Sequence, residues 1–299
     1  MKRRVLIMVL VFLVALAMMP MAGFAATKVV TTQETQYEKY DGDWRMTEKA
    51  TYTYNSKARL TKSVYINRFY GDNNAYTSEK SEFTKTYNSK GRLKTEIKKA
   101  DGIYYKSVYY YTSSGKFKEI KYYKKKASAS KYSANGHTKY TYSSTKNTIT
   151  EYNVKGKVES KKIQLLDSKK RVKTEKYYLG TTLEETRKYT YYSTGVVKKI
   201  VKTGNGMTIT ENYNKKGQVT TAVVEESDFY RFTTYTYDSY GRLKKEVSEV
   251  SDDYDSTTYT TTYKYSKYYK THKHPLTVLV YDYGDGEATR KTVYKYKSI

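Results

Sequence analysis

The sequence contains no cysteine, and this absence removes several classes of protein at once. A chain without thiols can form no disulfide framework, can use no thiolate in catalysis, and offers no cysteine to carry a lipid after a leader. Aromatic residues other than tyrosine are also scarce, with 7 Phe and 1 Trp against 39 Tyr. Ordinary cores use Leu, Ile, Val and Phe, so the excess of tyrosine predicts sheet faces that are apolar in body but keep their hydroxyls at water or at a hydrogen-bond partner.

Long apolar runs are missing except at the N-terminus. Residues 1–25 combine three cations at positions 2–4, an apolar stretch over 5–19, and the small residues Gly23 and Ala25. This pattern predicts a secretory signal peptide over 1–25, followed by a single domain over 26–299. A retained membrane anchor is the alternative, because the apolar stretch is about as long as the shortest membrane helices. We expect an extracellular, secreted protein that charge can hold at the cell wall, with no transmembrane segment after signal cleavage.

Acidic residues are outnumbered, with 30 Asp and Glu against 56 Lys and Arg. The formal net charge is +26, or +23 once the three cations of the leader are removed. So basic a surface attracts polyanions. Intracellular nucleic acid is not the expected partner, because the signal peptide argues against it. The expected partner is an anionic cell-wall polymer or polysaccharide.

What the chain has in abundance is one short repeat, an aromatic residue followed four positions later by a turn residue. Gly reaches positive φ at no steric cost, so Tyr-(Asn/Asp/Ser)-x-x-Gly predicts the end of a strand, a tight turn and the start of the next strand. Six of the nine copies end in Gly. The nine pairs are Tyr54 with Ala58, Tyr87 with Gly91, Tyr111 with Gly115, Tyr142 with Lys146, Tyr152 with Gly156, Leu166 with Lys170, Tyr191 with Gly195, Tyr213 with Gly217, and Tyr237 with Gly241.

The segments on both sides of each turn alternate with a period of two. Tyr-x-Tyr pairs precede the turns, and apolar or small residues alternate with charged ones after them, as in 93–98. This is strand geometry, and about nine units of two strands predict roughly twenty strands. Open sheets seldom exceed about ten strands, so the sheet must coil. We therefore predict an all-β fold, a long antiparallel meander of repeated hairpins coiled into a spiral or a flattened, barrel-like shell. A membrane barrel is the rival geometry, but it needs an unbroken apolar band that this alternation does not supply.

The motif Tyr-x-Tyr-Asp-x-x-Gly-Arg-Leu at 235–243 resembles the YD repeat of Rhs-type secreted and cell-surface proteins. Close copies lie at 52–60 and 87–93, and looser copies cover most of the remaining mature chain. The resemblance implies long β-hairpin spirals, in some members shells around a cargo, with carbohydrate binding proposed for some. This chain lacks the C-terminal toxin segment of the larger members and is short for enclosing a protein. Cargo delivery is therefore not what we expect of it.

Metal-binding patterns are weak. His272 and His274 could project to one face of a strand as two ligands, but two solvated histidines before Pro275 explain them more simply. Asp252, Asp253 and Asp255 lack the Gly and the distal Glu of a calcium loop, so a solvated acidic turn is the better interpretation. We predict no metal and no cofactor.

Catalytic patterns are equally thin. The adjacent carboxylates Glu184 and Glu185, like those at 225–226, would lie on opposite faces of a strand and so are not poised as an acid and base pair. No Gly-x-Ser-x-Gly nucleophile motif is present. The sequence predicts a protein that is not an enzyme.

Two functional classes fit these features. In the first, exposed tyrosines stack on sugar rings while interleaved cations attract polyanions. In the second, the repeats only hold shape, as a spacer, a surface coat or a remnant of a toxin-associated shell. For the binding class, the candidate residues come from the sharpest repeat and the strand that follows it. The alternative for the tyrosines is that they form the core, and the alternative for the cations is that they form a solvated face. The stacking candidates are Tyr235, Tyr237, Tyr263 and Tyr265, and the anion contacts are Arg242, Lys244 and Lys245.

Overall fold

The computed structural model describes residues 28–70, 75–252, 255–269, 271, 274–282 and 287–299. The predicted signal peptide, together with His272 and Asp253, lies outside these residues. Within them the chain is all strand, without a helix: β1 (Val29–Tyr40), β2 (Asp43–Tyr54), β3 (Leu60–Tyr70), β4 (Tyr76–Tyr87), β5 (Leu93–Ala100), β6 (Ile103–Tyr111), β7 (Phe117–Lys126), β8 (Ser133–Tyr142), β9 (Lys146–Tyr152), β10 (Val158–Leu166), β11 (Val172–Leu179), β12 (Thr182–Tyr191), β13 (Val197–Gly204), β14 (Met207–Tyr213), β15 (Val219–Glu225), β16 (Phe229–Tyr237), β17 (Leu243–Asp252), β18 (Ser256–Tyr268), β19 (Pro275–Tyr281) and β20 (Arg290–Ser298).

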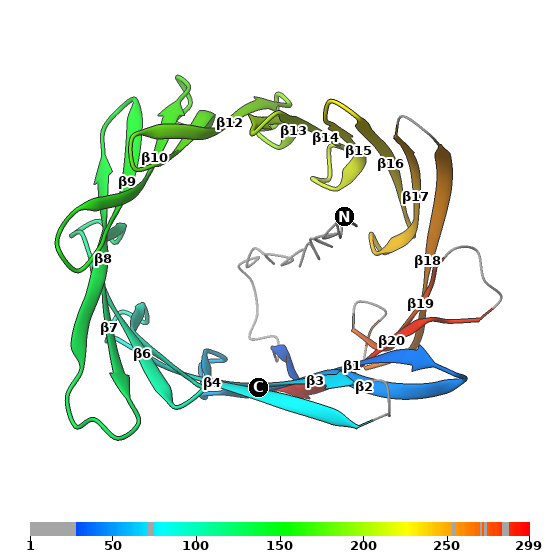
Figure 1. Cartoon of the computed structure of the whole chain (residues 1–299), viewed down its shortest axis with the longest axis horizontal. Helices are drawn as coiled ribbons and strands as arrows, with labels where there is room; N and C mark the ends of the chain where they lie inside the picture. Colours follow the sequence, from blue (N-terminus) through cyan, green and yellow to red (C-terminus); the bar gives the residue numbers. More distant parts are fainter. Residues whose placement is uncertain (1–27, 71–74, 253–254, 270, 272–273, 283–286) are drawn as a thin grey trace, which may run out of the picture.

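Every strand pairs antiparallel with its neighbours in the sequence, and β20 pairs back onto β1 (Figure 1). The sheet is therefore a closed up-and-down barrel of 20 strands, which confirms the predicted all-β meander coiled into a barrel-like shell. The seam between β1 and β20 runs from the pair Val29–Ser298 to the pair Glu38–Arg290. The described residues contain no helix that could cross a membrane.

The predicted turns form as the motif requires. At Asn88 the side-chain Oδ1 accepts from the Arg92 amide at 2.9 Å, and the Asn88 carbonyl accepts from the Gly91 amide at 2.8 Å. Gly91 has φ of 75°, the left-handed region that glycine enters without a steric penalty. Ala58 and Lys170 hold the same place in their turns at φ of 55° and 61°. The left-handed corner is thus kept even where the sequence has lost its glycine.

Two of the nine copies differ from the expected pattern. After Tyr142 the chain makes a shorter turn, in which the Ser143 amide donates to the Lys146 carbonyl and Lys146 already begins β9. The turn after Tyr152 forms at the opposite end of the barrel, because only the single strand β9 separates it from Tyr142. These two copies are therefore not separate two-strand units.

Six Tyr-x-Tyr pairs lie on one face of the sheet, which we call the tyrosine face: the pairs at 52/54, 109/111, 140/142, 189/191, 235/237 and 263/265. Cross-strand partners fix the assignment, since Tyr52 opposes Ser63 and Ser63 opposes Phe83. Eight of the ten buried residues described are on this face, all except Thr35 and Pro275. Of the sixteen described tyrosines whose pKa is raised by burial, fifteen are on it as well.

The tyrosine face lies on the inside of the ring. A closed sheet crowds the side chains on its concave side, which accounts for the burial just described. The turns that directly follow a tyrosine of this face, such as those joining β14 to β15 and β16 to β17, bend toward the inside of the ring (Figure 1). The opposite, outer face alternates mainly Thr, Lys and β-branched residues, as in the row Thr51, Val64 and Glu82.

The barrel has no conventional packed core. Twenty strands spaced about 4.8 Å apart and tilted as barrel strands usually are close into a ring roughly 40 Å across, whereas packed sheets lie only about 10 Å apart. Opposite walls are therefore too distant to interdigitate. Consistently, only four apolar residues among those described are buried: Ala50, Ile120, Pro275 and Val280. Stability must come from contacts within the single layer of sheet.

Candidate functional site

Tyrosines at one end of the barrel hold successive hairpins together. Each hydroxyl donates a hydrogen bond of 2.6–3.0 Å to the carbonyl of the first residue of the neighbouring strand. A buried phenol needs such a partner, so the repeated Tyr anchor has a structural role. The six pairs are Tyr87 with Leu60, Tyr111 with Leu93, Tyr191 with Val172, Tyr237 with Val219, Tyr265 with Leu243, and Tyr296 with Pro275.

The four tyrosines predicted to stack on a ligand lie together on the tyrosine face of β16 and β18. All four are partly buried, and burial raises the pKa of Tyr235 and of Tyr265 to about 12. The hydroxyls of Tyr237 and Tyr265 serve in the inter-hairpin bonds, and the Tyr263 hydroxyl lies 3.4 Å from a Glu246 carboxylate oxygen. These contacts tie the four rings into the wall of the ring. Their role as a stacking surface stays a prediction.

The three predicted anion contacts are separated by the fold. Arg242 pairs with Asp238 at 2.6 Å, and its guanidinium lies over the ring of Tyr265 at 4.3 Å from the centroid. Lys245 is exposed on the outer face, while Lys244 is the extra residue of a β-bulge. Arg242 is thus held on the inner side by neighbours of its own, and only the two lysines present free charge to solvent.

The inner face carries its own polar network in the middle of the wall. The Gln164 amide donates to Glu175 at 2.8 Å, and Glu175 also lies 3.6 Å from Lys162 and 3.9 Å from Arg187. Further along the same face, Lys202 pairs with Glu211 at 3.0 Å. These five charged side chains of the inner face, three cations and two acids, therefore largely compensate one another.

Cations on the outer face gather over β5 to β8, where acidic residues are few. Residues 103–142 contain nine lysines and one acidic residue, Glu119. Four of these lysines, together with Lys99 of β5, lie on the outer face, where they alternate with tyrosines. We call this surface the wall patch, and its members are Lys99, Tyr104, Lys106, Tyr110, Lys121, Tyr123, Lys125, Tyr132, Lys139 and Tyr152.

Lysine ammonium groups of the wall patch lie against tyrosine rings. Lys125 Nζ is 5.4 Å from the Tyr104 ring centroid and 5.2 Å from that of Tyr132, and Lys106 Nζ is 5.5 Å from Tyr132. Lys121 differs from the other lysines of the patch because its ammonium group lies 3.8 Å from a carboxylate oxygen of Glu119. For Lys99, Lys106, Lys125 and Lys139, no acidic partner lies within ion-pair distance among the described residues.

A shallow hollow of about 300 Å³ adjoins the wall patch at β7 to β9. His137 and Tyr152 stack at its edge, with ring centroids 4.6 Å apart and planes 10° apart. Gly136 is required there, since a Cβ at that position would lie 2.4 Å from the Tyr152 carbonyl oxygen. The hollow thus offers a flat aromatic edge beside cations, which suits a planar or ring-shaped group with negative charge nearby.

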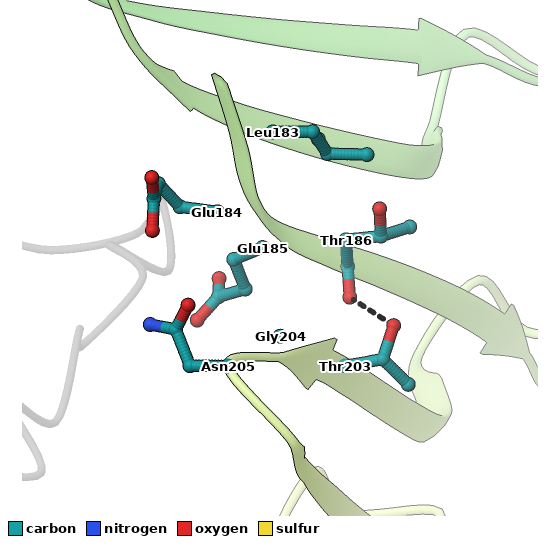
Figure 2. A pocket seen from close by; sticks show the side chains of 7 residues that line it. All are labelled: Leu183, Glu184, Glu185, Thr186, Thr203, Gly204 and Asn205. Carbon is teal, nitrogen blue, oxygen red and sulfur yellow. Dashed lines mark hydrogen bonds between the residues drawn. The ribbon is translucent and has the colours of Figure 1, made fainter.

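A second hollow of about 300 Å³ lies between β12 and the end of β13, lined by Glu184, Glu185, Thr203 and Asn205 among others (Figure 2). The two carboxylates were expected on opposite faces of a regular strand. Glu184 is instead the extra residue of a β-bulge, and Figure 2 shows both carboxylates on the same side of the hollow. Glu185 is already paired with Arg187. The described residues include no group of three or more His, Cys, Asp or Glu that could hold a metal ion.

Lysines interrupt the outer face in the middle of the strands, at Lys106, Lys121 and Lys176 for example. Charged residues interrupt the inner face as well, at Glu175 and Arg187. Neither face therefore carries the unbroken apolar band that the outside of a membrane barrel requires.

Comparison with known proteins gives distant likenesses of fold. No protein-family model and no curated protein matches the chain. Among solved structures, a porin-like protein from Bacteroides uniformis ATCC 8492 shares 12% identity over 89% of this chain and 98% of its own, with a TM-score of 0.36. A porin-like protein from Bacteroides vulgatus ATCC 8482 shares 11% identity over 89% of this chain and 98% of its own, with a TM-score of 0.27. The TcdB2–TccC3 structure shares 13% identity over 81% of this chain and 15% of its own, with a TM-score of 0.35. Values this low leave the family and the function of the chain open.

Proposed function

We propose that this protein is a secreted, non-enzymatic barrel that binds an anionic cell-wall polymer or extracellular polysaccharide on its outer wall. One observation carries the proposal, the wall patch, in which lysines without acidic partners alternate with tyrosines. A linear polyanion can lie along such a surface, with charges at the lysines and sugar rings or other flat groups against the tyrosines. The likeness of the turn motif to the YD repeat fits the same proposal, because carbohydrate binding has been proposed for some members of that family.

The wall patch replaces part of the surface predicted from the sharpest repeat. In that prediction the ligand stacked on the tyrosines of β16 and β18. Those rings lie on the inner face, where the hydroxyls of Tyr237, Tyr263 and Tyr265 have partners. Tyr104, in contrast, is on the outer face next to Lys99 and Lys125. Lys245 remains a useful comparison, because it is an exposed lysine on the same outer face but distant from the patch.

Binding of purified poly(glycerol phosphate) teichoic acid by isothermal calorimetry tests the proposal, with neutral dextran as the uncharged control. The wild type should bind teichoic acid at low salt and ignore dextran. The double variant Lys106→Glu/Lys125→Glu should bind at least tenfold more weakly. The matched variant Lys188→Glu/Lys245→Glu changes the net charge equally on the same face and should bind nearly as the wild type does.

Equal losses in the two variants would show that net charge alone, and not the wall patch, attracts the polymer. No binding by the wild type at low salt would reject the polyanion proposal and favour a protein that serves as a spacer or coat.

A further inference from the structure

The two ends of the barrel differ in charge. One end carries the turns that follow the even-numbered strands β2 to β16. These eight turns together hold eleven Lys or Arg and two Asp. In their described parts, the connections at the opposite end hold seven acidic residues and three lysines. We call these the basic end and the acidic end.

The charges of the basic end are available to a partner. Both of its acids are paired within their own turns, Asp167 with Arg171 and Asp238 with Arg242, each at 2.6 Å. The other two arginines, Arg59 and Arg92, lie over tyrosine rings at 5.7 Å and 5.6 Å. Lys116 Nζ lies 4.8 Å from the Tyr142 ring centroid, and Lys170 Nζ donates to the Ser144 carbonyl at 2.8 Å. The lysines of these turns have no acidic partner within ion-pair distance among the described residues, and all are exposed: Lys57, Lys90, Lys116, Lys169, Lys170, Lys215 and Lys216.

The arrangement of these lysines decides which kind of anion they fit. Adjacent turns at one end are two strands apart, which is about 10 Å. The lysines therefore stand around the circumference of a closed ring roughly 40 Å across. A single flexible polymer would have to bend around that circle to meet them. A planar surface of dense negative charge meets all of them at once.

From the exposed lysines at one end and the acids at the other, we propose that the basic end docks flat onto a bilayer of anionic phospholipid. The acidic end then faces away, because the same bilayer repels it. This surface is separate from the wall patch, and the inference goes beyond the proposed binding of a wall polymer. It also fixes the orientation of the barrel, with its axis along the bilayer normal.

Flotation with vesicles of phosphatidylcholine containing phosphatidylglycerol tests docking, with pure phosphatidylcholine vesicles as the control. The wild type should bind only the anionic vesicles, and salt should release it. The variant Lys57→Glu/Lys90→Glu/Lys215→Glu/Lys216→Glu should lose at least tenfold in vesicle binding while keeping its affinity for teichoic acid. A variant with four Glu replacements in the wall patch, at Lys99, Lys106, Lys125 and Lys139, should show the reverse.

The single tryptophan reports the orientation without any change to the basic end. Trp44 is the second residue of β2, at the acidic end. A strand of 12 residues places it about 30 Å from the basic end once a usual tilt is allowed for. Energy transfer from Trp44 to a dansyl-headgroup lipid should therefore be weak. In the variant Trp44→Phe/Tyr240→Trp, the introduced indole stands in an exposed turn of the basic end, and transfer should be several times stronger.

Each outcome gives a separate answer. Absence of vesicle binding by the wild type, or stronger transfer from Trp44 than from the introduced indole, overturns docking through the basic end. Equal vesicle binding by the two quadruple variants overturns it too. Loss of teichoic acid binding in the wall variant alone, with vesicle binding intact, supports both proposals independently.

Discussion

Replacing Lys106 and Lys125 by Gln should halve the steepness with which salt weakens binding of a single-stranded polyanion. Each lysine that neutralises a phosphate releases a condensed counterion, so the logarithm of the binding constant falls linearly with the logarithm of the salt concentration. The wall patch has four lysines without an acidic partner among the described residues, at positions 99, 106, 125 and 139. For single strands, the slope for four contacts is about −2.8.

Such a slope corresponds to a loss of about 50-fold in affinity between 50 and 200 mM salt. With two lysines removed, the slope should be about −1.4 and the loss over the same range about sevenfold. The variant should therefore differ most from the wild type at low salt and approach it at high salt. Lys121 should add little to the slope, because Glu119 at 3.8 Å already balances its charge.

Fluorescence anisotropy of a labelled oligothymidylate, titrated at four salt concentrations, measures the slope directly. Oligothymidylate serves only as a polyanion of uniform charge. The control Lys188→Gln/Lys245→Gln removes two lysines from the outer face elsewhere and should leave the slope unchanged. An unchanged slope in the patch variant, or an equal decrease in the control, would refute the assignment of binding to the wall patch.

The remaining predictions concern the turns and the inner face. Gly241→Ala should lower the free energy of unfolding by about 0.5–1 kcal/mol in urea titrations, because the strain of a Cβ at φ of 80° exceeds the entropy that alanine removes from the unfolded chain. An unchanged midpoint would contradict the turn argument. Ala58→Gly should raise the same free energy by about 0.5–1 kcal/mol, the relief of its left-handed strain less the added entropy of the unfolded chain. Burial raises the pKa of inner tyrosines such as Tyr265 to about 12, so they stay protonated in the folded protein while tyrosines of the unfolded chain ionise near pH 10. Their contribution to the free energy of unfolding is therefore full below pH 10 and is lost as the pH rises toward 12. Alkaline titration of phenolate absorbance should be biphasic, and a single step near pH 10 would place the rings in water. Burial raises the pKa of Glu246, so the charged carboxylate costs stability once the pH exceeds its ordinary value; Glu246→Gln should raise the melting temperature at pH 7 but not at pH 4, and equal shifts at both values would point instead to an uncharged cause such as the contact with Tyr263.

Local chemistry made the hairpins predictable from the sequence. The motif around Asn88 and Gly91 specifies its own turn, since the Asn side chain satisfies the amide of Arg92 and the glycine supplies the left-handed corner. Alternation in two-residue steps then gives the strands, and their number requires a curved sheet.

Closure of the ring could not be predicted in the same way. The pairing of β1 with β20 joins residues such as Glu34 and Tyr294 across nearly the whole chain, and backbone donors and acceptors of any two extended edges are chemically equivalent. The sequence therefore left a spiral and a barrel as open alternatives.

The candidate site shows the opposite difficulty. The copy at 235–243 has the clearest motif because its Tyr237 and Arg242 hold the turn and the neighbouring hairpin together, which is a structural role. The wall patch has no motif and was missed. Its signal was compositional, nine lysines and a single acid in residues 103–142, but only the strand register shows which of these lysines share a face with Tyr104 and Tyr110.

The seam between the first and last strands has a consequence for how the molecule is made. β1 leaves the ribosome first, yet one of its two edges has no partner until β20 has been synthesised. Until β20 has been made, the folded part of the sheet presents an unpaired edge, at which another chain could add a strand. Pairing of β20 with β1, which also brings Ile299 against Lys28, therefore removes both open edges of the sheet in a single step.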